Sequence, residues 1–211
     1  MRVLVVTGGH GYPTSFYTIF EQPGLVWDHE TTAEAAYRRD LRPRYDVVVM
    51  YDLVEKGLSA DARANLQAFA ESGKGIVVLH HALCSNNDWD WYRDLVGGRY
   101  LIVPQGGMPT STYQHEQTIP IAMGRPHPIT RGITLTEVYD EVYKGMWISP
   151  DATVLLTTTH PLSDPQLAWI SPYQKSRVVT IQLGHGRETH LNPQYRALVR
   201  NAILWSAGRL Q

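Results

Sequence analysis

Short apolar runs recur along this chain, and turns or polar segments separate them. Most of the runs are rich in valine and isoleucine, which fit the pleated surface of a sheet. A short and almost entirely apolar run is typical of a strand that is buried on both faces, as the strands of parallel sheets are. The expected strands span residues 3–6, 46–50, 76–79, 153–156 and 178–183.

Helical patterns lie between several of these runs. Ser59 precedes a stretch of strong helix formers and Gly73 follows it, which indicates a capped helix over about 59–70. Asn192 and Pro193 begin a second helix, whose apolar residues recur at helical spacing. Weaker helical patterns span 15–20 and 88–96. This alternation predicts an α/β fold with a doubly wound, mostly parallel sheet flanked by helices.

The segment from about 101 to 143 departs from this rhythm. It is rich in Pro, Gly, Ser and Thr, and its strand-like pieces at 117–123 and 134–139 are short. We expect an irregular insertion or an antiparallel extension that lies over one end of the sheet. No composition shift or linker divides the chain, so we expect residues 1–211 to form a single domain.

Composition and charge exclude several classes of function. Of the 211 residues, 43% are hydrophobic and 18% are charged, and the formal net charge is -1. This charge gives no basis for binding nucleic acid, and no apolar run approaches the roughly 20 residues that span a bilayer. The single cysteine, Cys84, excludes an internal disulfide and fits a reducing compartment. The first apolar run is too short for a secretory signal, so we expect a cytoplasmic protein.

Histidines follow three of the expected strands. His10 comes after the first strand, His80 and His81 come after 76–79, and His185 comes after the last strand. Open α/β sheets bind ligands beyond the carboxyl ends of their strands. If the strands are parallel, these imidazoles should therefore meet at one edge of the sheet. Because neighbouring side chains on a strand point to opposite faces, at most one of His80 and His81 should face a ligand unless the strand has ended. The other should be a hydrogen-bonded core histidine.

Acidic side chains provide candidate partners for these histidines. The sequence 140–144 contains Asp140, Glu141, Tyr143 and Lys144, which form either a solvated strand end or part of the site. In the second case one carboxylate acts as a general base or a metal ligand. Asp52 follows the strand 46–50 and either caps the next segment or lies in the site.

These patterns give a set of candidate residues with roles. The glycines around His10 match neither the dinucleotide nor the Walker spacing, so we expect no nucleotide. Imidazoles with a carboxylate suit a divalent ion such as zinc or manganese, although the chain has no short metal-binding motif on a helix. The candidate metal ligands are His10, His81 and His185. The candidate catalytic residues are His10, His81, Glu141 and His185. The candidate substrate-binding residues are Asp52, His80, Asp140, Tyr143 and Lys144.

Several segments together resemble the trehalose-utilisation (ThuA-like) family. The matching stretches are TGGH (7–10), YDVVVMYD (45–52), GKGIVVLHHALCS (73–85), LVGGRY (95–100), HPITRG (127–132), DEVYKG (140–145) and IQLGH (181–185). The resemblance implies a flavodoxin-like, class I glutamine-amidotransferase-like fold that has lost the glutaminase nucleophile. This agrees with the sequence, because an elbow nucleophile would follow Leu79, where this chain has His80. Cys84 lies further on and is expected to be a small buried residue.

The resemblance also implies a function in bacterial carbohydrate catabolism. Family members act beside sugar dehydrogenases that oxidise a 3-hydroxyl, which implies a keto-sugar or 3-keto-glycoside as substrate. The ketone acidifies the C2 proton, so that elimination, hydrolysis or isomerisation can begin with a base, for which Glu141 and His81 are candidates. A metal or His185 would stabilise the enolate.

The alternative is a non-catalytic carbohydrate-binding or regulatory protein that keeps the amidotransferase-like fold. A residual glutaminase activity is disfavoured because the elbow cysteine is missing. Aromatic residues such as Trp147 and Tyr173 make a homodimer a further expectation.

Overall fold

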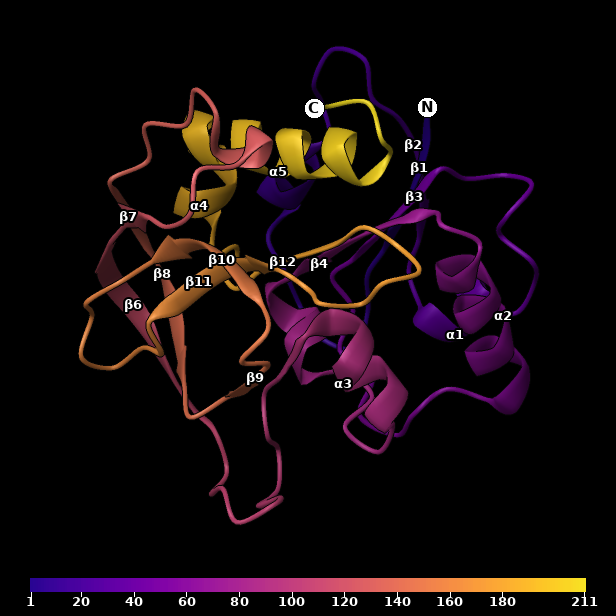
Figure 1. Ribbon diagram of the computed structural model, residues 1–211, viewed down its shortest axis with the longest axis horizontal. Helices are drawn as coiled ribbons and strands as arrows, with labels where there is room; N and C mark the ends of the chain where they lie inside the picture. Colours follow the sequence, from indigo (N-terminus) through magenta and orange to yellow (C-terminus); the bar gives the residue numbers. More distant parts are fainter.

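A twisted eight-stranded sheet forms the centre of the computed structural model, which describes residues 1–211 (Figure 1). Its strand order is β2-β1-β3-β4-β12-β11-β10-β7. The first five strands in this order run parallel, and the last three are antiparallel additions at one side. The bounds are β1 Arg2–Val6, β2 Val26–Glu30, β3 Val47–Met50, β4 Gly75–Leu79, β7 Ala122–Met123, β10 Thr153–Thr157, β11 Gln166–Ile170 and β12 Val178–Ile181. The predicted α/β class with a mostly parallel sheet is confirmed.

Helices cover both faces of this sheet. In Figure 1, α4 and α5 lie on one side of β4 and β12, and α1, α2 and α3 lie on the other. Side chains of the central parallel strands β1, β3 and β4 alternate between two buried cores of 29 and 27 residues, so neither face of these strands is exposed to water. No helix is long and apolar enough to cross a membrane. The helical bounds are η1 Thr14–Ile19, α1 Ala33–Tyr37, α2 Ala60–Glu71, η2 His80–Cys84, α3 Asp90–Val96, η3 Pro128–Thr130, α4 Arg187–Leu191 and α5 Pro193–Ser206.

The helix signals in the sequence correspond to caps in the structure. The Ser59 side chain accepts a hydrogen bond from the Ala62 amide at the start of α2. The Asn192 side chain accepts from two amides at the start of α5, directly before Pro193. The weaker pattern at 15–20 corresponds to a 3-10 helix, η1. Because these signals are local hydrogen-bond requirements of the helix ends, the sequence alone reveals them.

Three elements of the central sheet region were not expected from the sequence. Strand β2 lies at the edge and its residues are exposed or half-buried, so it has no uniformly apolar run. Helix α1 is only one turn and a half long, and β11 mixes polar and apolar residues. Strands β10 and β11 form an antiparallel hairpin-like pair instead of continuing the parallel order. Periodicity fails at these places because edge and short elements do not require a continuous buried face.

The segment that departs from the strand–helix rhythm contributes a second, two-stranded antiparallel sheet. This sheet pairs β6 (Thr112–Pro120) with β8 (Glu137–Lys144), and its apolar residues Ile119, Val138 and Val142 join the same core as α5. A further short pair joins β5 (Gly98–Arg99) to β9 (Trp147–Ile148). Strand β8 continues to Lys144, so Asp140 and Glu141 lie within a strand. Both side chains are buried, which excludes a solvated strand end.

The register of the parallel strands brings their carboxyl ends to one level. Val6 pairs with Met50, Met50 pairs with Val78, and Leu79 pairs with Ile181. The segments that follow β1, β3, β4 and β12 therefore begin at one edge of the sheet.

The turn after β1 depends on two glycines in the left-handed region. Gly8 and Gly9 have φ angles of 111° and 80°. A Cβ atom at Gly9 would lie 1.8 Å from the Leu53 carbonyl oxygen, and one at Gly8 would lie 2.2 Å from the Thr31 carbonyl oxygen. Only glycine allows the backbone of this turn to lie so close to the carbonyl groups of Thr31 and Leu53. The turn directs the next residue, His10, across the edge of the sheet.

We expect Gly9→Ala to destabilise the protein by roughly 3 kcal/mol, because backbone strain and a clash with backbone atoms add together. Urea unfolding measures the loss. Gly11→Ala is the matched control in the same loop, since a Cβ atom there meets nothing within 4 Å and φ is not positive. Equal stability of the two variants would contradict this account of the turn.

Candidate functional site

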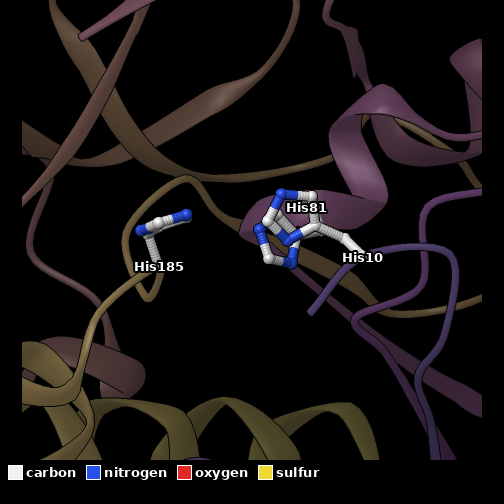
Figure 2. Close-up of side chains that lie close together, drawn as sticks. All are labelled: His10, His81 and His185. Atoms are coloured by element: carbon white, nitrogen blue, oxygen red, sulfur yellow. The ribbon is translucent and has the colours of Figure 1, made fainter. Parts of the chain in front are cut away.

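Three imidazoles from three strand ends meet beyond the carboxyl edge of the sheet. The ring centroids of His10 and His81 are 4.2 Å apart, those of His81 and His185 are 5.3 Å apart, and those of His10 and His185 are 5.9 Å apart. Each ring offers one nitrogen atom, and these three nitrogens lie within 4.8 Å of one another. Figure 2 shows the rings on three separate segments, with His185 across from His10 and His81. The convergence that parallel strands predicted is present.

The turn after β4 separates the two adjacent histidines. The strand ends at Leu79, and the backbone of His80 has a φ angle of 35°, which residues other than glycine rarely adopt. This turn buries His80 completely and leaves His81 among the residues that line a cavity. One histidine is a hydrogen-bonded core residue and the other faces the cavity, as the sequence suggested for the pair. The core residue is His80, so its predicted role as a substrate contact is wrong, because the turn buries it outside the cavity lining.

Buried His80 is fixed on both sides of its ring. Its Nδ1 donates a hydrogen bond to the Gln182 carbonyl oxygen, 2.5 Å away, since that oxygen can only accept. Its Nε2 lies 2.7 Å from Glu141 Oε2 and 2.8 Å from the Tyr143 hydroxyl. A carboxylate oxygen this close to Nε2 requires a proton between the two atoms. The pair of His80 and Glu141 therefore shares one proton.

The environment decides where that proton lies. Burial raises the pKa of Glu141, although the nearby His185 and His115 partly offset this effect. Burial also lowers the pKa of His80 well below its usual range. Both shifts favour the neutral forms, so the proton belongs to the Glu141 carboxyl group, which donates to His80 Nε2.

His115 belongs to this cluster, although no pattern in the sequence indicates it. Its Nδ1 lies 3.2 Å from Glu141 Oε1, and its ring centroid is 4.8 Å from that of His185. The pairing of β6 with β8 shifts here, so that residues 115 and 116 both oppose Glu141, and Glu116 has a φ angle of 59°. This is a β-bulge, a device that re-aims side chains beside functional sites. No sequence signal marks a bulge of this kind, because it depends on pairing with a distant strand.

A cavity of about 400 Å³ lies in front of these residues. Its lining includes the imidazoles of His10, His81 and His115 and the carboxyl group of Glu141. His185 is not part of this lining, but its Nε2 lies 3.9 Å from Glu141 Oε2. The remaining lining residues are Leu53, Glu55, Cys84, Tyr100, Ile102, Tyr113 and Tyr143. A cavity of this size is in the range of small-molecule sites.

His81 has the properties of a metal ligand. It is 2% exposed, and neither ring nitrogen has a hydrogen-bond partner in the protein. Burial, and then the neighbouring imidazoles of His80 and His10, lower its pKa far below the usual range, so the ring is neutral and keeps a free lone pair. Three imidazoles suit zinc or a similar divalent ion. The residues of the cluster His10, His81 and His185 therefore fit such an ion.

Asp140 supports the site from behind. Its carboxylate accepts hydrogen bonds from the amides of Gly184, His185 and Gly186, at 2.6, 2.9 and 3.1 Å. These bonds fix the loop that carries His185. Asp140 is not among the residues that line the cavity, so the structure places it as a positioning residue for His185, whereas the sequence suggested substrate contact.

Two other predicted substrate contacts lie elsewhere. Lys144 is exposed, and its Nζ donates to the Pro161 carbonyl oxygen, because the alternation along β8 turns it away from the side that carries Tyr143. Asp52 is 2% exposed, lies beside the Ser85 hydroxyl at 3.1 Å and lines a second cavity of about 190 Å³. Tyr143, in contrast, lines the main cavity.

Cys84 lines the main cavity but is not an activated nucleophile. Burial raises the pKa of its thiol to about 12. The thiolate is the reactive form of cysteine, so this thiol stays protonated and inert at neutral pH. The sequence-based expectation of a small buried residue agrees with this environment.

Asp52 should make the stability of the protein depend on pH. Burial raises its pKa to about 6, above the value of roughly 3.9 in an unfolded chain. Its stabilising contribution is therefore fully present below about pH 4 and is lost as the pH rises through 6. Asp52→Asn removes this dependence, so its stability relative to the original protein should rise by about 2 kcal/mol between pH 4 and pH 7.5.

Urea unfolding at both pH values measures this difference. Asp151→Asn, at an exposed turn, is the control and should give the same difference at both pH values. A stability difference for Asp52→Asn that does not change with pH would refute the assignment of a buried, proton-binding carboxyl group.

Comparisons with known proteins agree with the fold. A family model described as trehalose utilisation, ThuA, matches residues 2–206. No curated protein matches the chain. A ThuA-like protein from Parabacteroides merdae is 17% identical, with a TM-score of 0.81, over 100% of this chain and 91% of that chain.

More distant structures share only the fold. A glutamine amidotransferase from Thermotoga maritima is 10% identical, with a TM-score of 0.53, over 98% of both chains. A β-galactosidase from Rahnella sp. R3 is 13% identical, with a TM-score of 0.63, over 96% of this chain and 30% of that chain. These likenesses confirm the predicted amidotransferase-like α/β fold. Since the family model matches nearly every residue, the chain belongs to the trehalose-utilisation (ThuA) family.

Proposed function

We propose that this protein is an enzyme of carbohydrate catabolism that acts on a neutral keto-sugar, in particular a 3-keto-glycoside, by acid–base chemistry. The observation that carries the proposal is the proton-sharing pair of Glu141 and His80 beside a cavity that His10, His81 and His115 also line. Membership of the trehalose-utilisation family supports a sugar as the substrate. A glutaminase activity is not part of the proposal, because Cys84 is held as an inert thiol.

The charges of the cavity favour a neutral ligand. No lysine or arginine lines it, and its ionisable groups are imidazoles and the carboxyl groups of Glu55 and Glu141. A sugar phosphate would find no lysine or arginine side chain there to form an ion pair that offsets its desolvation. A glycoside with a ketone has no charge and can use the imidazoles as hydrogen-bond donors and acceptors.

A C3 ketone makes the chemistry accessible to such groups. The ketone acidifies the proton on C2, and a base can remove it with the C–H electron pair passing to the enolate. The enolate then reforms the C3 carbonyl, a C1–C2 double bond forms, and the aglycone leaves from C1 with its bonding electrons and takes up a proton. No oxidant or reductant is consumed. A dehydrogenase that oxidises the 3-hydroxyl of a glycoside must supply the substrate.

Glu141 and His80 are suited to act together as the base. In this scheme Oε1 of Glu141 accepts the C2 proton, while the proton on Oε2 moves to His80 Nε2. The Gln182 carbonyl oxygen already accepts from Nδ1, so it stabilises the imidazolium that forms. His80 is fully buried, and hence Glu141 is the member of the pair that reaches the substrate.

His10, His81 and His185 would hold a divalent ion such as zinc or manganese. When bound, this ion would act as a Lewis acid on the ketone oxygen. The support for this part is the pair of unpartnered nitrogens on buried His81 and the closeness of the three rings. Asp140 orients the His185 loop through its three amide bonds.

Glu141→Gln should lower kcat on a 3-keto-glucoside by about 100-fold or more, the usual effect of removing a general base. The glutamine keeps the shape and can still bond to His80, so the melting temperature should change by only a few degrees. Glu137→Gln, at an exposed position on the same strand, is the control and should keep full activity. Normal turnover by Glu141→Gln would rule out this role.

Protein purified without a chelator should contain about one equivalent of zinc or manganese, as measured by inductively coupled plasma mass spectrometry. His185→Ala should lose this metal while its fold remains intact, because the side chain is partly exposed. His160→Ala, outside the cluster, should retain it. Protein that stays metal-free after incubation with either ion, and that turns over no 3-keto-glycoside, would instead support a non-catalytic carbohydrate-binding protein.

A further inference from the structure

The main cavity has two chemically different walls. The inner wall consists of His10, His81, His115 and Glu141, which the proposed chemistry uses. A second group of lining residues, Leu53, Tyr100, Ile102 and Tyr113, is mainly apolar, and we call this group the outer wall because Ile102 and Tyr113 are exposed. Most of the outer wall comes from the stretch between β5 and the start of β6, which forms the long loop below β9 in Figure 1.

The outer wall offers almost no free hydrogen-bonding groups. The Tyr100 hydroxyl donates to the Ser111 carbonyl oxygen at 3.0 Å, so this ring presents only carbon to the cavity. Leu53 and Ile102 are aliphatic. The Tyr113 hydroxyl is the one polar side-chain group of this wall without a protein partner, and Glu55 lies at the same cavity.

The outer wall is also open to an incoming molecule. Ile102 is 42% exposed and Tyr113 is 58% exposed, although both are large apolar side chains. Apolar side chains gathered at the mouth of a cavity indicate a surface that a ligand covers. Their exposure also means that substitutions there leave the core of the protein unchanged.

We propose that the outer wall is a subsite for an apolar, preferably aromatic, aglycone, so that the substrates are keto-glycosides of aryl or alkyl alcohols and not disaccharides. This inference rests on the proposed function. A second sugar ring would bring several hydroxyl groups against this wall, and each would lose its bonds to water without a replacement, at roughly 1–3 kcal/mol per group. An aromatic aglycone would instead stack on the Tyr113 and Tyr100 rings and cover Ile102.

Within this class, the leaving-group chemistry favours aryl over alkyl aglycones. A phenol is acidic, with a pKa near 10, as for a tyrosine side chain. A phenolate therefore leaves C1 with little help from an acid. None of the four residues of the outer wall carries an acidic group. Glu55 and Glu141 are the only carboxyl-bearing residues that line the cavity, which suits an aglycone that needs little protonation.

The test compares kcat/KM for phenyl 3-keto-glucosides, of both anomers, with kcat/KM for 3-keto-trehalose. We expect the phenyl compound of the matching anomer to be at least 10-fold better. Ile102→Ser and Tyr113→Ser should each lower that preference by 5-fold or more, mainly through a higher KM, with the disaccharide value changed less than 3-fold. Val103→Ser is the matched control, because Val103 is 60% exposed next to Ile102 but does not line the cavity. It should alter neither value.

A disaccharide used as well as the phenyl glycoside, or an aryl preference that survives both substitutions, would overturn the inference. A separate binding measurement distinguishes failure of this inference from failure of the proposed chemistry. If no keto-glycoside is turned over, isothermal titration calorimetry with unoxidised phenyl glucosides and with trehalose still tests whether the outer wall binds an apolar aglycone. Binding of a phenyl glucoside that is abolished by Tyr113→Ser would support the aglycone subsite. No binding of either sugar would contradict it.

Discussion

His80 joins the central sheet to the two-stranded sheet that forms one side of the site. It follows β4, donates to the Gln182 carbonyl oxygen at the end of β12, and accepts the Glu141 proton from β8. Since it is fully buried, none of these bonds competes with water, and each unmade bond would cost the full desolvation of its group. The positions of Glu141 and of the cavity in front of it therefore depend on this one side chain.

Asp140 performs a parallel task one residue away. Neighbouring residues on a strand point to opposite sides, so β8 directs Glu141 toward the cavity and Asp140 toward the loop after β12. The three amides that Asp140 accepts from fix His185 opposite His10 and His81. The two adjacent carboxyl groups thus have different positions, since Glu141 lines the cavity and Asp140 supports the backbone that carries His185.

Desolvation sets the chemistry that this arrangement can perform. Several imidazoles lie within a few ångströms of one another, and burial lowers the pKa of His80 and His81 so that they are neutral and do not repel each other. Burial keeps the Cys84 thiol protonated as well. The fold resembles that of a glutamine amidotransferase, yet the position after β4 holds a buried histidine, and the one cysteine of the chain is an unactivated thiol.

The amino-acid sequence alone predicts the central parallel strands, the capped helices α2 and α5, and the edge at which the histidines gather. These features follow from local patterns, because a strand buried on both faces needs an apolar run and a helix end needs a cap. Only the tertiary structure decided that His80 is buried while His81 faces the cavity, that Asp140 binds backbone amides, and that Lys144 points away. It also brought in His115, through a bulge where residues more than twenty positions apart along the chain are paired. Such roles depend on the register and the turn geometry of distant segments, and no single stretch of sequence contains that information.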